Sequence, residues 1–234
     1  MYKKWIYAIC TLGFLSNAMV SARAVIVDQN TLFPDDATLF STSSWPLGMR
    51  GFNVGQVFTP GITGYLDSID VQFLFGPSGP NDVDRTFLIS RVGADGLPTG
   101  EVLATASASQ PVVEDPSVFA LYTLNIDYSF ADVFLTAGEQ YALIPTLSDP
   151  DVIESWGGWL FAVSTSDGQV FGNHYADGYG IYQFPGEAWQ NFDFDPTLTF
   201  DVGFATYMRP VPLPAAIWLL LGALAVLPKR KSAT

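Results

Sequence analysis

The stretch YLDSIDVQFLF, Tyr65–Phe75, alternates between two kinds of side chain. In an extended chain its latter half places Ile69, Val71 and Phe73 on one side and the polar residues between them on the other. Because successive side chains of a β-strand point to opposite faces of the sheet, this pattern predicts a strand with one buried face. The strand is expected to end at the glycine- and proline-rich loop GPSGPND, residues 76–82.

Short runs of the same kind, separated by turn residues, continue along the chain. TFLISRV (86–92) and EVLATASA (101–108) are predicted to form a hairpin whose connection, GADGLPTG, contains glycines that supply positive φ. Further strands are predicted at residues 119–126, 133–146, 158–164, 168–175 and 197–207. With turn signals about every ten residues and no sustained helical period, this pattern predicts an all-β fold, a single β-sandwich or barrel over residues 25–208.

Composition and charge narrow the classes of partner. The chain of 234 residues is 49% hydrophobic and 14% charged, which is ample material for one packed core. Residues 25–209 contain all 23 carboxylates of the chain and only four basic residues, all arginines. The formal charge of this stretch is therefore −19. Such a surface repels phosphate backbones, so we expect no nucleic-acid partner. The only cysteine, Cys10, lies in the first apolar stretch, so the body is predicted to have no disulfide.

Residues 1–24 have the three parts of a secretory signal peptide. The basic start MYKK is followed by the apolar run Trp5–Leu15 and by small residues at Ala22 and Ala24. As a helix, that run covers about 17 Å, well short of the roughly 30 Å hydrocarbon core of a bilayer. We therefore predict export through the Sec machinery and cleavage between Ala24 and Val25, in preference to a permanent N-terminal anchor.

Residues 209–234 contain a second apolar run. Ala215–Leu227 spans about 20 Å as a helix, and the preceding residues 211–214 extend the reach to about 26 Å. The run is apolar all the way round, which disfavours a helix packed on the body by one face. It ends at a basic cluster, Lys229, Arg230 and Lys231, which the positive-inside bias places in the cytoplasm. The sequence thus predicts a C-terminal membrane helix with Arg209 at the opposite interface and the body outside.

The start of this tail, Val211, Pro212, Leu213, Pro214 and Ala215, together with the helix and basic cluster, resembles the VPLPA form of the PEP-CTERM sorting signal of Gram-negative bacteria. Pro228, directly before the basic cluster, departs from the family's pattern. The resemblance implies recognition by an exosortase in the inner membrane, cutting near the motif, and a final location at the cell surface or in the extracellular matrix.

Four phrases of the body, GQVFTP, DGLPTGEVLATA, LTAGEQYALI and FDVGFATY, also resemble the exported jelly-roll-type domains that often precede such a tail. That resemblance implies a jelly-roll-like sandwich and supplies no catalytic motif.

The residues give little support to catalysis. His174 is the only histidine, and no G-x-S-x-G turn surrounds any serine, so a structural or surface role is favoured for His174. A pair of carboxylates could serve a glycosidase, but strand spacing does not set the separation that such a pair needs. We predict no catalytic residue and no enzyme activity, with a secreted hydrolase as an unfavoured alternative.

Two acidic loops are candidate calcium sites. SDPDVIE offers Asp149, Asp151 and Glu154, and NFDFDP offers Asp193 and Asp195 at alternate positions. Clustered carboxylates suit Ca²⁺, but neither loop has the spacing of an EF-hand. Solvated turn residues are the favoured interpretation, calcium is the alternative, and no other cofactor is expected.

Three late aromatic residues, Trp156, Tyr179 and Trp189, lie next to Gly, Glu or Gln. Flat rings on a sandwich can stack on sugar faces while neighbouring polar groups bind hydroxyls, although core packing is the competing interpretation. The leading hypothesis is a structural or adhesive protein of the surface or matrix. The alternative is a binding module for extracellular polysaccharide, which requires the three rings to share one exposed face.

Overall fold

The computed structural model describes residues 24–32, 45–46, 53–75, 84–109, 120–147, 157–159, 161–164, 170–171, 175–184, 186–192 and 199–211. Val25–Arg209 form one compact unit, and Met1–Ala24 with Pro210–Thr234 form another. The described part of the chain contains strands and turns and no helix, which confirms the all-β prediction there. A helix able to cross a membrane is likewise absent from those residues. The predicted helix Ala215–Leu227 and the basic cluster lie outside them.

The larger sheet has seven strands. Its order is β1 (Ile26–Asn30), β16 (Phe204–Pro210), β4 (Gly64–Phe75), β10 (Gly157–Trp159) and β2 (Trp45–Pro46), and β7 (Ala120–Asp127) and β8 (Phe134–Leu135) also pair with β4. A three-stranded sheet has the order β12 (Val170–Phe171), β11 (Phe161–Ser164), β15 (Thr199–Val202).

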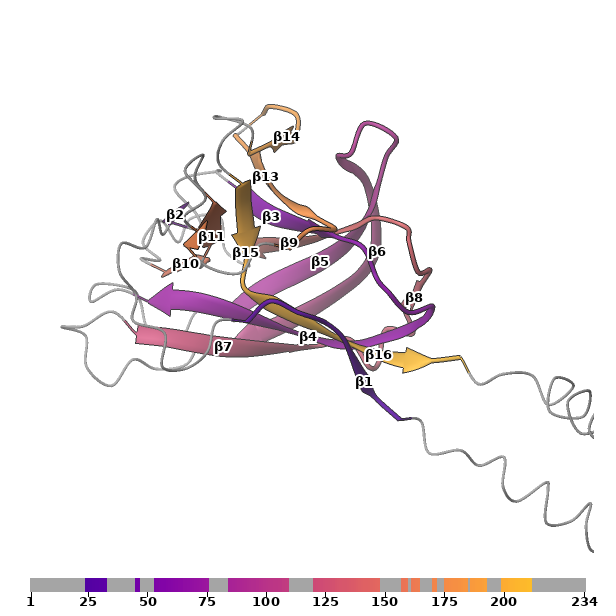
Figure 1. Ribbon diagram of the computed structural model, residues 1–234. Helices are drawn as coiled ribbons and strands as arrows, with labels where there is room; N and C mark the ends of the chain where they lie inside the picture. Colours follow the sequence, from indigo (N-terminus) through magenta and orange to yellow (C-terminus); the bar gives the residue numbers. More distant parts are fainter. Residues whose placement is uncertain are drawn as a thin grey trace, which may run out of the picture. The chain divides into compact units, whose positions relative to one another are not determined.

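The second large sheet has six strands. Its order is β14 (Gln190–Asn191), β13 (Tyr179–Gln183), β3 (Asn53–Phe58), β9 (Tyr141–Leu147), β5 (Asp84–Val92) and β6 (Pro98–Ser109). Figure 1 shows β4 and β7 of the seven-stranded sheet below β3, β5 and β9 of this one. The strand pairs with a defined register in both large sheets are antiparallel, an arrangement consistent with a β-sandwich.

The core lies between the two large sheets. Ile69, Val71 and Phe73 are fully buried, as the alternation of their strand predicts. The Phe73 ring meets the Phe87 ring of β5 edge to face, with centroids 6.2 Å apart. In the first half of β4 Leu66 is buried, although strict alternation with Ile69, Val71 and Phe73 would place it on the opposite face. The alternation of β4 therefore changes phase between Leu66 and Ile69.

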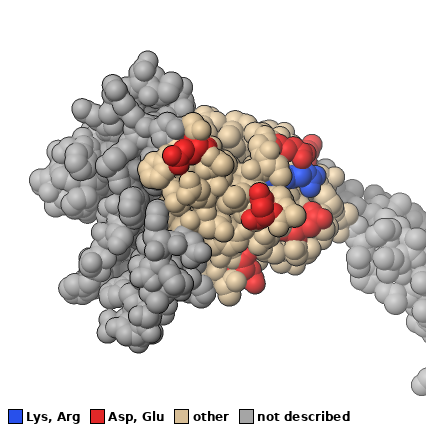
Figure 2. Space-filling model, turned by 90° about the horizontal axis from the view of Figure 1, so that it is seen from above, with Lys and Arg blue, Asp and Glu red and all other residues tan. Residues whose placement is uncertain are grey.

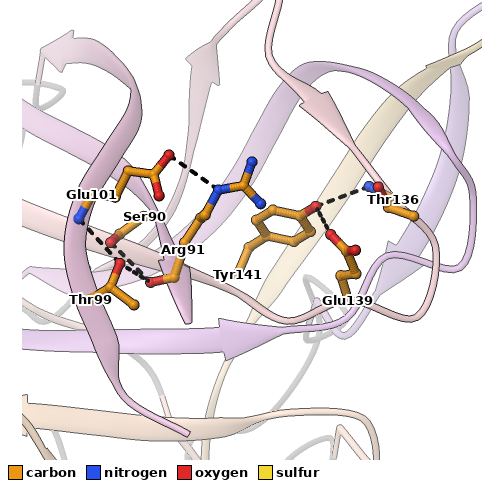
Figure 3. A network of polar contacts seen from close by, with 7 residues as sticks. All are labelled: Ser90, Arg91, Thr99, Glu101, Thr136, Glu139 and Tyr141. Atoms are coloured by element: carbon orange, nitrogen blue, oxygen red, sulfur yellow. Dashed lines mark hydrogen bonds and ion pairs between the residues drawn. The ribbon is translucent and has the colours of Figure 1, made fainter. Parts of the chain in front are cut away.

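Three predicted strands are divided. The stretch 133–146 forms β8 and β9, separated by a turn in which Gly138 has a φ of +82°. The Tyr141 hydroxyl holds this turn: it accepts a hydrogen bond from the Thr136 N–H (3.1 Å) and donates one to Glu139 Oε2 (2.9 Å) (Figure 3). The stretch 158–164 contributes to β10 and β11, and 197–207 to β15 and β16, in each case in two different sheets.

The predicted hairpin is confirmed. β5 and β6 pair through the turn Gly93–Leu97, where the Gly93 N–H donates to the Leu97 carbonyl (2.8 Å), and Gly96 and Gly100 have positive φ. At its base Arg91 Nε lies 3.2 Å from Glu101 Oε1 (Figure 3). Both side chains are about half exposed, so this ion pair contributes at most about 1 kcal/mol.

The first and last strands of the unit lie side by side. Ile26 pairs with Met208 and Val27 with Tyr207. Just beyond β1, the buried Thr31 hydroxyl lies 3.1 Å from the Phe204 carbonyl and 3.2 Å from that of Val202. The two ends of the compact unit are therefore neighbours, and Arg209 belongs to β16.

Candidate functional site

The outer face of the six-stranded sheet carries a second apolar cluster. Its buried members are Val57, Ala142, Ile144 and Ile181. On β9, Tyr141 and Leu143 point into the main core, so the residues between and after them point outward. A buried apolar group on an outer face must be covered by other side chains, and two of the predicted aromatic residues, Tyr179 and Trp189, provide part of that cover.

Cross-strand pairing explains how Tyr179 reaches the cluster. Tyr179 pairs with Val57, and Val57 pairs with Ala142, so their side chains lie on one face. Next along β13, Ile181 lies opposite Gly55. A Cβ atom at Gly55 would lie 2.9 Å from the Leu143 carbonyl oxygen and 3.1 Å from Ile181 Cγ1. A glycine at position 55 therefore lets Ile181 lie against the sheet.

Tyr179 also holds the β5–β6 turn. Its hydroxyl donates a 2.6 Å hydrogen bond to the Gly96 carbonyl, and Leu97 of the same turn packs on the cluster. Burial raises the pKa of Tyr179, with a smaller contribution from the negative charge of Asp95. Because the Tyr179 hydroxyl already donates to Gly96, a ligand could contact only the half-buried ring of Tyr179.

Trp189 lies just before β14, which pairs with β13 through Tyr182 and Gln190. Gln183 lies on the same face of β13 as Tyr179 and Ile181, and its Nε2 donates to the Glu187 carbonyl (3.0 Å). The Gln190 and Glu187 side chains bond each other (3.2 Å) on the side of Tyr182, a residue of the main core. An indole with a side-chain amide on the same face of the sheet can pack against an apolar sugar face, and the amide can bind a hydroxyl group.

The structure thus brings Tyr179 and Trp189 together on one face, both half-buried. Trp156, the third predicted ring, lies outside the described residues. So do Asp149, Asp151, Glu154, Asp193 and Asp195, the candidate calcium ligands, and His174. Among the residues that are described, no group of three or more His, Cys, Asp or Glu side chains could hold a metal ion.

The body carries far more acidic than basic side chains. Figure 2 shows the red Asp and Glu side chains of the visible face in separate groups, with a small blue area beside some of them. This distribution agrees with the low number of basic residues in the body. The charge pattern of the sequence could not predict the outer apolar cluster. The cluster forms because the strand register pairs Tyr179 with Val57 and Val57 with Ala142.

No protein-family model matches the chain, and no curated protein matches it.

Proposed function

We propose that this chain is an exported, non-catalytic protein of the cell surface or extracellular matrix of a Gram-negative bacterium. Its tail holds it in the inner membrane until an exosortase cuts near Val211. Its body is a jelly-roll-like sandwich, a proposal that the two large antiparallel sheets support.

The observation that carries this proposal is the extent of the compact unit. It begins at Val25, the first residue after the expected signal cleavage, and ends at Arg209, two residues before the sorting motif. Removal of residues 1–24 and of the segment from about Val211 onward would leave every strand of the unit in place, β16 included, which ends at Pro210. The body is therefore suited to be cargo that survives processing at both termini.

Mass analysis of the natural protein tests the proposal. The expected mature chain begins at Val25 and lacks the segment from about Val211 onward. Pro212→Ala with Pro214→Ala should leave the tail attached, whereas Pro228→Ala, outside the motif, should not. Surface-located protein with an intact tail in the unaltered strain would reject processing.

Binding of extracellular polysaccharide is a second candidate function, favoured by the common face of Tyr179 and Trp189. The protein should be retarded by the host's matrix polysaccharide in affinity electrophoresis, and Trp189→Ala should reduce the retardation. Phe184→Ala is the matched control, because Phe184 is an exposed aromatic residue just beyond β13 that is not part of the outer cluster. Equal retardation of both variants would remove Trp189 from the site.

A further inference from the structure

Exposed apolar side chains surround Arg209 at one end of the seven-stranded sheet. We call this surface the Arg209 patch; its members are Val25, Val27, Tyr65, Phe130 and Phe134. Phe130, at the tip of a turn, is 91% exposed, and Val27 is 54% exposed. A group of exposed apolar residues of this kind, rimmed by polar ones, is typical of an interaction surface.

Ring contacts and a hydrogen bond link Tyr65, Phe134 and the Phe130 turn to Arg209. Tyr65 and Phe134 are opposite each other in the β4–β8 pair, and their rings meet edge to face at 5.4 Å. The Arg209 guanidinium lies 5.9 Å from the centroid of the Tyr65 ring. Its Nη2 donates a 3.1 Å hydrogen bond to the Ser129 carbonyl, which fixes the turn that carries Phe130.

Val27 of β1 and Val25, just before that strand, complete the patch. Val27 pairs with Tyr207, and side chains of paired residues lie on the same face. Since side chains alternate along a strand, Arg209 shares that face with Tyr207. The Tyr207 hydroxyl in turn donates a hydrogen bond to Asp70 Oδ2 of β4 (2.8 Å). The other oxygen of this carboxylate, Oδ1, accepts a hydrogen bond from the side chain of Asn125 on β7.

The charge of Arg209 is offset inside the protein. Its Nε lies 3.1 Å from Asp67 Oδ1 without hydrogen-bond geometry, so this contact is an ion pair, and the Arg209 side chain is only 11% exposed. Its Nη2 also lies 3.9 Å from Asp132 Oδ1, at the exposed rim. The patch therefore offers apolar surface with no net positive charge, and anionic ligands would gain nothing from it.

We propose that the Arg209 patch rests on the zwitterionic headgroup region of the membrane that holds the tail. This inference depends on the proposed function, because the tail must be inserted. Only residues 210–214 separate Arg209 from the apolar run at Ala215, and five extended residues reach at most about 17 Å. Exposed Phe and Tyr side chains are suited to the interface between water and hydrocarbon.

The short tether explains why a weak patch would be enough. A surface held within about 17 Å of the bilayer has a high effective concentration, so a few exposed rings can make contact without binding membranes on their own. Cleavage near Val211 would remove the tether and so release the patch. The formal charge of −19 on the body would oppose contact with anionic lipids.

A probe on the Phe130 turn tests the contact. The full chain carries Cys10→Ala, so that an introduced cysteine is the only thiol, and Ala131→Cys, labelled with a polarity-sensitive fluorophore. In phosphatidylcholine vesicles we expect quenching by headgroup-linked nitroxide lipid and several-fold slower quenching by aqueous iodide than for Thr105→Cys. Thr105 is the matched control because it is exposed on β6, in the other large sheet.

The outcomes separate the two proposals. Protein that floats with the vesicles but shows equal iodide quenching at both positions overturns the patch contact and leaves tail insertion intact. Shielding at 131 without nitroxide quenching also overturns it, since protein would then cover the patch. If the protein does not float with the vesicles, both the proposed insertion of the tail and the proposed contact of the patch are wrong. Phe130→Ser with Phe134→Ser should float normally and raise iodide quenching at 131 to the level at 105; an unchanged value would count against the patch.

Discussion

Arg85 is a cation in the apolar interior, and its replacement by methionine should stabilise the protein. Only 1% of Arg85 is exposed, and within the described part of the chain its Nε and Nη2 have no hydrogen-bond partner. Arg85 lies on β5 two residues before Phe87, and its guanidinium is 5.9 Å from the centroid of the Phe73 ring. Buried charges without a counter-charge are costly, and an apolar side chain of similar volume removes that cost.

The magnitude follows from the electrostatics. Burial lowers the pKa of Arg85 to about 10, well below the usual value of a guanidinium, which corresponds to roughly 3 kcal/mol against the charged form near neutral pH. The contact with the Phe73 ring returns about 0.5–2 kcal/mol of this. Methionine retains most of the aliphatic packing. The free energy of unfolding of Arg85→Met should therefore exceed that of the parent by about 1–3 kcal/mol.

Urea unfolding at neutral pH measures this difference, and the melting temperature should rise by about 2–4 °C for each kcal/mol in a domain of this size. Arg91→Met is the control: the same strand and the same substitution, but an exposed ion pair, so we expect a change within about 0.5 kcal/mol. A loss of stability of about 2 kcal/mol or more for Arg85→Met would refute the reasoning, because it would mean that the guanidinium has a counter-charge.

Three further predictions concern unfolding. Gly178→Ala should lower the free energy of unfolding in urea by about 2 kcal/mol or more, because its Cβ would overlap the Val57 carbonyl oxygen and lie 2.6 Å from two Tyr175 ring atoms. Gly138→Ala is the control: it is strained only by its positive φ and should lower the free energy of unfolding by about 1 kcal/mol. Thr31→Val should cost about 1–2 kcal/mol, because Phe204 N–H loses its bond to the buried hydroxyl; an effect no larger than that of exposed Thr99→Val would contradict this. Finally, stability should be constant from pH 8 to about pH 10 and fall above it, because tyrosines of the unfolded state ionise there while four folded tyrosines ionise only at higher pH. Their pKa values are raised, by burial in Tyr128, Tyr141 and Tyr179 and by the bond to Asp70 in Tyr207. Urea titrations from pH 8 to 11 in the Arg85→Met background exclude the opposing effect of the lowered Arg85 pKa, and a flat profile would sink the idea.

Local patterns were enough to predict the all-β class and the β5–β6 hairpin. The alternation at Ile69, Val71 and Phe73 and the glycines around the turn express rules that act over a few residues. The division of 197–207 between two sheets could not be predicted this way, because it depends on which distant strand each half meets: β11 for Thr199–Val202, and β1 and β4 for Phe204–Pro210.

The sites show the same limit. Tyr179 and Trp189 were identified by their polar neighbours, but their common cluster depends on the pairing of β13 with β3. The Arg209 patch had no signal in the sequence. Arg209 was predicted to flank a membrane helix, and the structure places its side chain against Asp67 and Ser129 of the body. Tyr65 and Phe134, almost seventy residues apart, meet only because β8 pairs with the start of β4.

The pairing of the first strand with the last has a consequence for the order in which the protein can be made and folded. The Gln29 backbone N–H donates a hydrogen bond to the Thr206 side-chain hydroxyl, 177 residues further along the chain. A polypeptide that crosses the export channel from its N-terminus must keep β1 without its partner until nearly the whole body has emerged, and pairing over so long a separation is slow. Because only residues 210–214 separate Arg209 from the apolar run at Ala215, the proposed export would bring the last strand out of the channel just before that run enters it. Completion of the sheet and the proposed arrest of the chain in the bilayer would then be almost simultaneous events.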